Sequence, residues 1–505
     1  MSALDPSSVI AVVGAGAMGG GVAQVAAAAG HPVRLYDQAD GAARAAIGRI
    51  AQGLDKLVKR GRISAEEQQA LVERIQPVER LEAIGDAALV IEAIVEDLDV
   101  KQRLFRELET LCPKAILASN TSSLSITAIG SALERPQRLL GMHFFNPAPI
   151  MKLVEIISGL ASDPALAETL FDTATAWGKL AVHARSTPGF IVNRVARPYY
   201  AEALRLLQEG AADAATLDAI YRDGGGFRMG PFELMDLIGQ DVNYAVTESV
   251  HHAYYGDPRF TPSLIQKELV DAGWLGRKSG RGFYDYGEDA DNPAPAEQPP
   301  CAPPREVNVI GPETQTAPWQ ALLESSGVAF QVLPGERVSI LCDGFTLCPS
   351  DGRMATVRAH RDNIRDLVLY DLCLDLENTA RITLCAADQA TPRALEQATG
   401  LLQALGKRVT VIDDVPGMVV LRTVAMLANE GADAVNQGVC DAAAVDTAMQ
   451  AGVNYPLGPL AWADRIGLRP LLKVLKHLQK TYGEDRYRPS PLLLRKVAAG
   501  EGFHD

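Results

Sequence analysis

The sequence predicts a protein of mixed class, α/β plus all-α, in which a doubly wound sheet and a helical domain precede a smaller α/β domain and a second helical domain. Three observations support this prediction. A glycine-rich loop near the N-terminus opens a run of alternating strands and helices. A proline-rich segment divides the 505 residues into two halves. The second half then repeats part of the first at an offset of 228 residues.

The strongest local pattern is "VIAVVGAGAMGGG". A strand from Val9 to Val13 runs into Gly14-x-Gly16-x-x-Gly19 and then into a helix rich in small residues. Gly14 permits a tight turn, Gly16 lets the backbone approach a pyrophosphate, and Gly19 lets the helix pack closely on the sheet. The next predicted strand, "PVRLYD", ends in Asp37, whose carboxylate suits both ribose hydroxyls and repels a 2′-phosphate. We therefore predict a Rossmann-type domain over residues 1–185 that prefers NAD to NADP.

The predicted sheet continues through "AALVIEAIVED" and "AILASN", and both segments end in polar residues. Glu96 follows the first strand, and Asn120 to Ser123 follow the second. Ligands of such folds lie across the carboxyl ends of the strands, so these side chains should border the cofactor. The serines could also cap the next helix, and the two roles are compatible.

The segment "GMHFFNPAPIMKLVEII" places His143 twelve residues before Glu155. Pro147 and Pro149 exclude one continuous helix and predict a turn between two strands, which could set the histidine beside the glutamate. Oxidation of a secondary alcohol by hydride transfer needs a base for the hydroxyl proton and donors for the developing carbonyl oxygen. An imidazole backed by a carboxylate suits the first task, and Ser and Asn side chains suit the second. Taken alone, such a pair is more often structural than catalytic.

The remainder of the chain shows three further segments. Residues 186–286 read as a helical domain. Residues 287–305, "GEDADNPAPAEQPPCAPPR", hold six prolines and four acids, so we expect an extended, exposed linker. Residues 306–413 are predicted to form a reduced Rossmann-like domain, whose short strands are "EVNVIG", "RVSILCDG", "DLVLYDLCLDL" and "RITLCAAD". Residues 414–505 are predicted to form a second helical domain.

The second helical domain looks like a copy of the first. Residues 187–194, "TPGFIVNR", align with 415–422, "VPGMVVLR", and between Pro188 and Gly239 about sixteen of 52 positions are identical. Within the aligned octapeptides Asn193 becomes Leu421, so an amide side chain is replaced by an apolar one. These features indicate an internal duplication in which only the first copy keeps the polar residue.

Composition narrows the possible partners and location. The net charge of −14 and the pI near 5.2 argue against nucleic acid or an anionic membrane as the main partner. No apolar run approaches the roughly 18 residues of a membrane span, and the N-terminal apolar run lacks the basic start of a signal peptide. Seven scattered cysteines argue against a disulfide framework. We expect a cytoplasmic protein without a metal site.

Several motifs together resemble the L-3-hydroxyacyl-CoA dehydrogenase family: "VVGAGAMGGG", "EAIVEDLDVK", "SNTSSLSIT", "GMHFFNPAPIMKLVEII", "TPGFIVNR", "MGPFELMDLIG" and "GRKSGRGFYDY". They occur in order from residue 9 to about residue 286. The resemblance implies NAD-dependent oxidation of an L-3-hydroxyacyl-CoA to the 3-oxoacyl-CoA, and a homodimer. Because the sequence begins directly with the Rossmann strand, we expect no hydratase domain before it.

The resemblance also implies roles for individual residues. His143 would be the base and Glu155 its partner, while Ser122 and Asn193 would hydrogen-bond the substrate. The cofactor would be held or bordered by Gly14, Gly16, Met18, Gly19, Asp37, Glu96, Lys101, Asn146 and Lys278. Coenzyme A would contact Lys56, Lys59, Arg60 and Ser122, although these basic residues could instead form a solvated helix face. At one position near them where the family often has serine, this chain has Gly53.

The second half resembles the added domains of long bacterial family members. It has neither the glycine motif nor a His-Glu pair at the same spacing, so we expect a scaffold and one active site per chain. Among long members, the 3-hydroxyadipyl-CoA dehydrogenases of phenylacetate degradation are the favoured match, with 3-hydroxybutyryl-CoA dehydrogenases as the alternative. Two other classes stay open: a β-hydroxyacid dehydrogenase with a catalytic lysine, which would need Lys where Asn193 stands, and a non-catalytic NAD-binding protein.

Overall fold

The computed structural model describes residues 2–505, which divide into two compact units. The first unit comprises the chain up to Arg194 together with Gln437–Val453. The second unit comprises Val195–Asn436 and Asn454–Asp505. A stretch of the second helical domain therefore belongs to the N-terminal unit, which the sequence did not indicate. The predicted division at residues 185, 286, 305 and 413 stays a prediction.

The first unit contains an eight-stranded sheet in the order β3-β2-β1-β4-β5-β6-β7-β8. Neighbouring strands run parallel, except for the antiparallel pair β6 and β7. The strands are β1 (Ile10–Val13), β2 (Val33–Tyr36), β3 (Ile75–Val78), β4 (Leu89–Glu92), β5 (Ile116–Ser119), β6 (Leu139–Phe144), β7 (Leu153–Ser158) and β8 (Leu180–Arg185). The helices are α1 (Ala17–Ala28), α2 (Ala42–Lys59), α3 (Ala65–Glu73), α4 (Leu98–Leu111), α5 (Ile126–Gly130), α6 (Pro164–Ala176) and α17 (Ala442–Val453), and α7 (Val192–Val195) ends at the boundary between the units.

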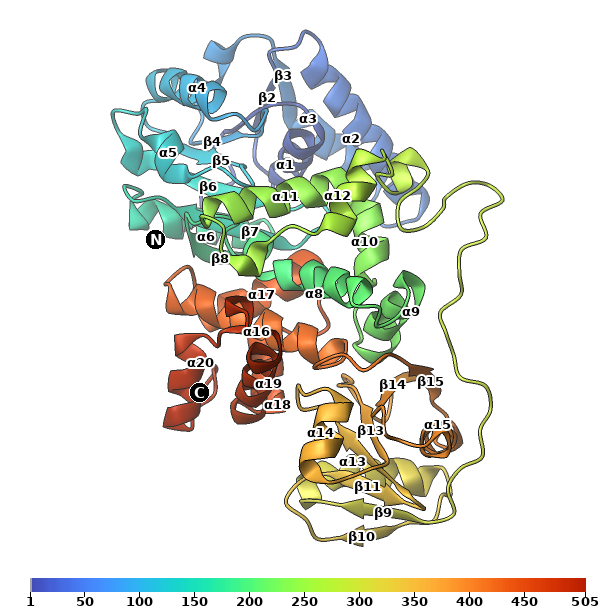
Figure 1. The fold of residues 1–505 in the computed structure, drawn as a ribbon. Coiled ribbons are helices and arrows are strands. Elements are labelled where there is room, and N and C mark those ends of the chain that lie inside the picture. Colours follow the sequence, from blue (N-terminus) through green and yellow to red (C-terminus); the bar gives the residue numbers. More distant parts are fainter. Residues whose placement is uncertain (1) are drawn as a thin grey trace. The chain divides into compact units, whose positions relative to one another are not determined.

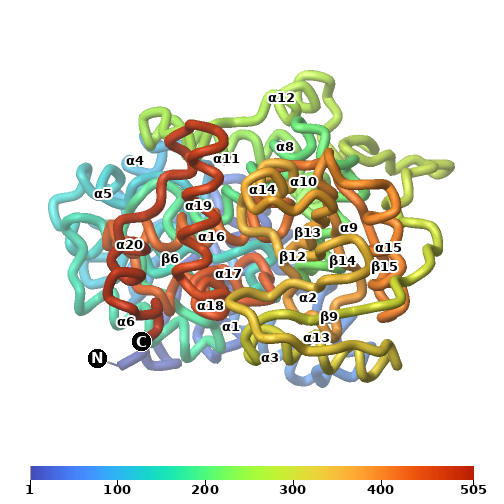
Figure 2. The backbone as a smooth tube through the Cα atoms, turned by 60° about the horizontal axis from the view of Figure 1, so that its bottom comes forward, coloured from blue at the N-terminus to red at the C-terminus, as the bar shows by residue number. Residues whose placement is uncertain are grey.

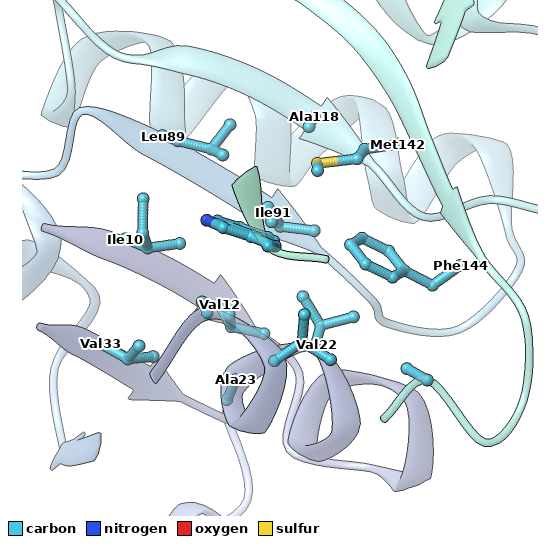
Figure 3. Close-up of a cluster of buried hydrophobic side chains, with 14 of the residues drawn as sticks. Ile10, Val12, Val22, Ala23, Val33, Leu89, Ile91, Ala118, Met142 and Phe144 are labelled. Carbon is cyan, nitrogen blue, oxygen red and sulfur yellow. The ribbon is translucent and has the colours of Figure 1, made fainter. Parts of the chain in front are cut away.

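Helices cover both faces of this sheet, as expected for a doubly wound fold (Figure 1). Because successive strand residues point to opposite faces, Ile10 and Val12 of β1 pack toward α1, where they meet Val22 and Ala23 (Figure 3). Helices α2 and α6 extend the same buried cluster. Phe105 of α4 is also fully buried, on a helix that packs beside β5. The predicted Rossmann-type domain is confirmed.

The second unit contains a seven-stranded sheet and the remaining helices. Its strand order is β10-β9-β11-β12-β13-β14-β15. The strands are β9 (Val307–Ile310), β10 (Gln331–Leu333), β11 (Ser339–Cys342), β12 (Phe345–Pro349), β13 (Leu367–Tyr370), β14 (Arg381–Ala386) and β15 (Arg408–Val411). The helices are α8 (Arg197–Gln208), α9 (Ala214–Ala219), α10 (Pro231–Ile238), α11 (Gln240–Ala253), α12 (Leu264–Asp271), α13 (Glu313–Ser325), α14 (Ala355–Asp362), α15 (Pro392–Ala404), α16 (Val420–Asn436), α18 (Pro459–Ile466), α19 (Leu468–Tyr482) and α20 (Pro491–Ala499).

This second sheet is a shortened version of the first. Strands β12 to β15 pair parallel, antiparallel and parallel in turn, as β5 to β8 do. The principal difference is β11, which runs antiparallel to both of its neighbours, whereas β4 in the corresponding place is parallel to both. The predicted reduced Rossmann-like domain is confirmed. Three of its strands, β10, β12 and β15, were not among the predicted ones.

The linker over 287–305 contains neither helix nor strand, and most of its residues are exposed, as predicted. It is nevertheless attached to the second sheet. The Gln298 amide donates to the Val409 carbonyl at 2.9 Å, and the Gln403 side chain donates to the Pro299 carbonyl at 2.9 Å. No helix among residues 2–505 is long and apolar enough to cross a membrane.

Candidate functional site

The glycine loop lies between β1 and α1 and has little room for side chains. Gly14 has φ +106°, and a Cβ atom there would stand 2.4 Å from the Ala93 carbonyl oxygen. A Cβ atom at Gly19 would stand 1.8 Å from the Gly14 carbonyl oxygen. At Gly16, by contrast, a Cβ would meet nothing within 4 Å. The first and third glycines therefore close the turn, and the second leaves an open approach to the N-terminus of α1, as binding of a diphosphate requires.

Asp37 follows β2 and faces this loop. Its Oδ2 accepts a hydrogen bond from the Ala15 amide at 2.7 Å, and its Oδ1 accepts one from the Ala39 amide at 2.9 Å. The carboxylate is thereby fixed beside the glycine turn. Met18 lies half-buried in the first turn of α1. These residues fit the diphosphate and adenosine ribose of NAD.

A buried ionic network lies at the carboxyl ends of β4 and β5. Lys101 Nζ lies 2.5 Å from Glu92 Oε1 and 3.3 Å from Glu96 Oε2. Glu92 and Lys101 are 0% and 1% exposed, and the Ser119 hydroxyl donates to Glu92 at 2.6 Å. Lys101 therefore holds Glu96 in place, and its predicted contact with the cofactor stays a prediction. Glu92 was not among the predicted site residues. Its signal in the sequence is an acid at the end of the apolar strand "LVIE", nine residues before a lysine.

Glu96 organises the polar loop after β5. Its Oε1 accepts hydrogen bonds from the Thr121 hydroxyl at 2.6 Å, the Ser122 amide at 3.0 Å and the Ser123 amide at 3.1 Å. Burial raises the pKa of Glu96, but the Thr121 hydrogen bond and the Lys101 charge outweigh burial, so its pKa lies below the ordinary value. The ionised carboxylate thus shapes the loop that presents Ser122.

His143 and Glu155 face each other across the antiparallel pair β6 and β7, as the prolines between them predicted. The two residues are register partners, and His143 Nδ1 lies 2.6 Å from Glu155 Oε2. The histidine is 5% exposed and the glutamate 0%. Because a carboxylate can only accept, Nδ1 carries the proton in this pair and Nε2 is left as an acceptor. That tautomer can take a proton from a substrate hydroxyl.

The second oxygen of Glu155 closes the turn into α7. Its Oε1 accepts from the Ile191 amide at 2.9 Å and from the Val192 amide at 3.1 Å. This turn is tight, since Gly189 and Phe190 have φ values of 75° and 46°. Phe190 also packs on the imidazole, with ring centroids 5.9 Å apart. One carboxylate therefore fixes both the base and the start of the helix that carries Asn193.

Asn193 and Ser122 meet near this pair. The Asn193 side-chain amide donates to the Ser122 carbonyl at 3.4 Å. Ser122 is exposed and Asn193 partly so. The first unit therefore gathers a base with its carboxylate partner and two further donors, which are the groups that oxidation of an alcohol requires.

Within residues 2–505, no hydrogen bond joins the remaining predicted contact residues to this group. Asn146 lies exposed between β6 and β7. Lys56, Lys59 and Arg60 are exposed at the end of α2, where their side chains have no hydrogen bond or ion pair within residues 2–505. Lys278 belongs to the second unit and pairs with Asp241 at 2.5 Å. Their predicted roles stay predictions.

A segment from the second half also belongs to the first unit, although no pattern in the sequence indicated it. Helix α17 packs on β7 and β8, and Gly452 lies so close to Leu153 that a Cβ would stand 2.6 Å from its side chain. The Arg185 amide donates to the Val439 carbonyl at 2.8 Å. The strand that carries Glu155 is thus covered by the duplicated part of the chain.

The second copy places different residues at the four positions that are predicted to be catalytic. Strand register sets Asp371 where the first copy has His143 and Thr383 where it has Glu155. The pairing of β12 with β13 corresponds to that of β5 with β6, and it sets Asp351 at the place of Ser122. With Leu421 in place of Asn193, all four positions have changed, which agrees with the prediction of one active site per chain.

Comparison with known proteins places both copies in one family. The model described as "3-hydroxyacyl-CoA dehydrogenase, NAD binding domain" matches residues 9–187, and its C-terminal-domain counterpart matches 189–286 and 417–502. A "3-hydroxybutyryl-CoA dehydrogenase reduced Rossmann-fold domain" model matches 347–416.

Individual relatives indicate the same family. The chain is 44% identical over 498 residues to a 3-hydroxyadipyl-CoA dehydrogenase of Escherichia coli, covering 98% of each chain. It is 44% identical over 280 residues to a probable 3-hydroxybutyryl-CoA dehydrogenase of Bacillus subtilis, covering 55% of this chain and 97% of that one. A crystal structure of a 3-hydroxybutyryl-CoA dehydrogenase from Escherichia coli matches with a TM-score of 0.89 and 43% identity, over 98% of this chain and 99% of that chain. The chain belongs to the NAD-dependent 3-hydroxyacyl-CoA dehydrogenase family.

Proposed function

We propose that this chain oxidises 3-hydroxyadipyl-CoA to the 3-oxo thioester, with NAD as acceptor of the hydride from C3. The observation that carries the reaction is the 2.6 Å contact between His143 Nδ1 and Glu155 Oε2, which leaves Nε2 free to take the C3 hydroxyl proton. The proposed substrate rests on similarity over nearly the whole chain to a relative of that name.

The proton path follows from the residues of the first unit. His143 removes the hydroxyl proton while Glu155 stabilises the resulting imidazolium. Ser122 and Asn193 lie at the same site and donate to the oxygen that becomes a carbonyl. Gly14, Gly16, Met18, Gly19 and Asp37 would hold the cofactor, with Glu96, Lys101, Asn146 and Lys278 at its border.

The exposed cations at the end of α2 fit the phosphates of coenzyme A. Lys56 and Lys59 stand in the last turn, and Arg60 follows the helix directly. We place the coenzyme A phosphates at these three residues. We also propose that the enzyme is a cytoplasmic homodimer acting in phenylacetate catabolism.

A second substrate, 3-hydroxybutyryl-CoA, is favoured by the similar crystal structure of the Escherichia coli 3-hydroxybutyryl-CoA dehydrogenase. The test is NADH absorbance when purified protein meets each thioester with NAD, compared by kcat/KM. A higher kcat/KM for 3-hydroxyadipyl-CoA supports the proposal, and a higher value for 3-hydroxybutyryl-CoA replaces the substrate. Turnover of no CoA thioester would contradict the proposed reaction, and comparable turnover of free hydroxy acids would favour the lysine-dependent class.

A further inference from the structure

The second unit contains a cavity of about 590 Å³ at the carboxyl edge of its reduced sheet. This second-copy cavity is lined by Asp351, Asp371 and Leu421, which are the counterparts of Ser122, His143 and Asn193. The duplication has therefore preserved a hollow where the first copy has its catalytic residues. Its size lies in the range of cavities that hold small molecules.

The polar residues at this place no longer support the chemistry of the first copy. Asp371 accepts from the amides of Val419, Val420 and Leu421 at 2.7–3.0 Å, so its oxygens are occupied by the start of α16. Asp351 is paired with Arg353 at 2.8 Å. The cavity therefore offers neither a free base nor a free carboxylate.

The wall of the cavity is mainly apolar. Trp319 of α13 and Val474 of α19 are almost fully buried, and Leu421 is 5% exposed. The segment before α14 lies against α19 on one side, where a Cβ at Gly352 would stand 2.8 Å from Val474 (Figure 2). An apolar group that entered this space would be transferred from water to an apolar surface, which is favourable.

Cations surround this apolar wall. Arg469 and Lys473 line the cavity four residues apart on α19, so both lie on one face of that helix, and Arg337 lines it from the segment before β11. Arg337 and Arg469 are exposed, and within residues 2–505 neither side chain has a hydrogen-bond or ion-pair partner. Lys473 forms an ion pair of 3.4 Å with Asp351.

One further polar group is unsatisfied. Ser350 lines the cavity, and its hydroxyl oxygen is buried without a hydrogen-bond partner among the described residues. A buried hydroxyl left without a partner costs free energy, so a ligand that supplies one stabilises the site. This donor, the apolar wall and the two arginines without partners, Arg337 and Arg469, all point to the same class of ligand.

We propose that the second-copy cavity is a non-catalytic binding site for a small amphipathic organic anion. The apolar body of the ligand lies against Trp319, Leu421 and Val474, and its anionic group is held by Arg469 and Lys473. A free carboxylic acid and an acyl thioester of coenzyme A both have this chemistry. The site is separate from the oxidation at His143 and does not depend on it.

The test uses the full-length protein and the fluorescent arylsulfonate 8-anilinonaphthalene-1-sulfonate as probe. We expect saturable binding that Arg469→Glu with Lys473→Glu weakens about tenfold or more, because the anion then meets like charge. The matched control is Lys476→Glu with Lys480→Glu, which changes the net charge equally on exposed positions of the same helix and should bind as wild type does. Turnover should be unchanged in both double variants.

Competition then identifies the source of the ligand. Displacement of the probe by octanoate indicates a free acid, and displacement by octanoyl-CoA alone indicates a thioester. In either case, the probe binding that the competitor displaces must be absent in Arg469→Glu with Lys473→Glu. Leu421→Trp, which narrows the cavity at its apolar wall, should also weaken the binding that these competitors displace, with the melting temperature as the control for folding. Equal probe binding by the two double variants, or displacement by neither competitor, overturns the proposal whether or not Leu421→Trp folds.

Discussion

Glu155 and Asp371 hold the starts of two duplicated helices, but from different strand positions. Glu155 Oε1 accepts from the Ile191 and Val192 amides, and Asp371 Oδ2 accepts from the corresponding amides of Val419 and Val420. By register, however, Asp371 occupies the place of His143. In the second copy the capping carboxylate has therefore taken the place of the base, and the helix start is preserved without an imidazole.

Replacing His143 tests the base directly. His143→Ala should lower kcat by about 10²–10⁴-fold, because the hydroxyl proton then has no positioned acceptor. NAD binding should stay near normal, since the glycine loop and Asp37 are untouched; calorimetric titration with NAD is the control. Turnover that is unchanged in this variant would remove His143 as the base.

Glu155→Gln should show whether Glu155 acts by orienting the His143 imidazole or by stabilising the fold. If the new amide oxygen continues to accept from Ile191 and Val192, its NH₂ group faces His143 Nδ1 and forces the proton onto Nε2. The imidazole then cannot act as a base, and kcat should fall by about 10³–10⁴-fold with little change in melting temperature. If the amide turns round, both backbone donors lose their acceptor and the melting temperature should fall as well. Wild-type kcat in this variant would contradict the assigned role.

Asp37→Asn should change cofactor preference. The asparagine oxygen can still accept from the Ala15 amide, so the contact with the glycine turn is kept, while the hydrogen bond from the Ala39 amide and the negative charge are lost. Because the carboxylate repels a 2′-phosphate, the ratio of kcat/KM for NADP to that for NAD should rise about tenfold. Asp40→Asn, an exposed substitution after the same strand, is the matched control. An unchanged ratio would show that Asp37 does not contact the ribose.

The predictable part of the site consists of short patterns whose geometry is local. The glycine loop, Asp37 at a strand end, and the pairing of His143 with Glu155 across two prolines all follow from the permitted conformations of a few neighbouring residues. The buried Glu92–Lys101 pair had a local signal, an acid at a strand end nine residues before a lysine, but its contact with Ser119 depends on β5 lying beside β4. The placement of α17 in the first unit depends on packing between segments nearly 300 residues apart, for which the sequence has no local pattern.

Asp371 should make stability depend on pH in an unusual direction. Burial raises its pKa to about 6, and the amide hydrogen bonds only partly offset this. The folded state thus binds the proton more tightly than the unfolded state, whose pKa is near the ordinary 3.8. Its contribution to stability is fully present below about pH 4 and is lost as the pH rises to about 6.

The comparison with Asp371→Asn isolates this effect. The free energy of unfolding of the wild type relative to the variant should fall by about 2 kcal/mol between pH 4 and pH 6 and level off above about pH 7. Denaturant unfolding at pH 4, 5, 6 and 7.5 provides the measurement. A difference that does not vary over this range would show that the carboxyl group titrates normally.

Leu421→Asn restores the lost amide of the second copy and tests how many active sites the chain has. No second activity should arise, because Asp371 has its oxygens on backbone amides and Asp351 is paired with Arg353. The variant should be less stable by about 1–3 kcal/mol, since an amide is buried where an apolar side chain packed. Asn193→Leu is the reciprocal variant and should lower kcat sharply while the protein stays folded. Activity that survives Asn193→Leu but is lost in Leu421→Ala would reverse the assignment and make the second copy the catalytic one.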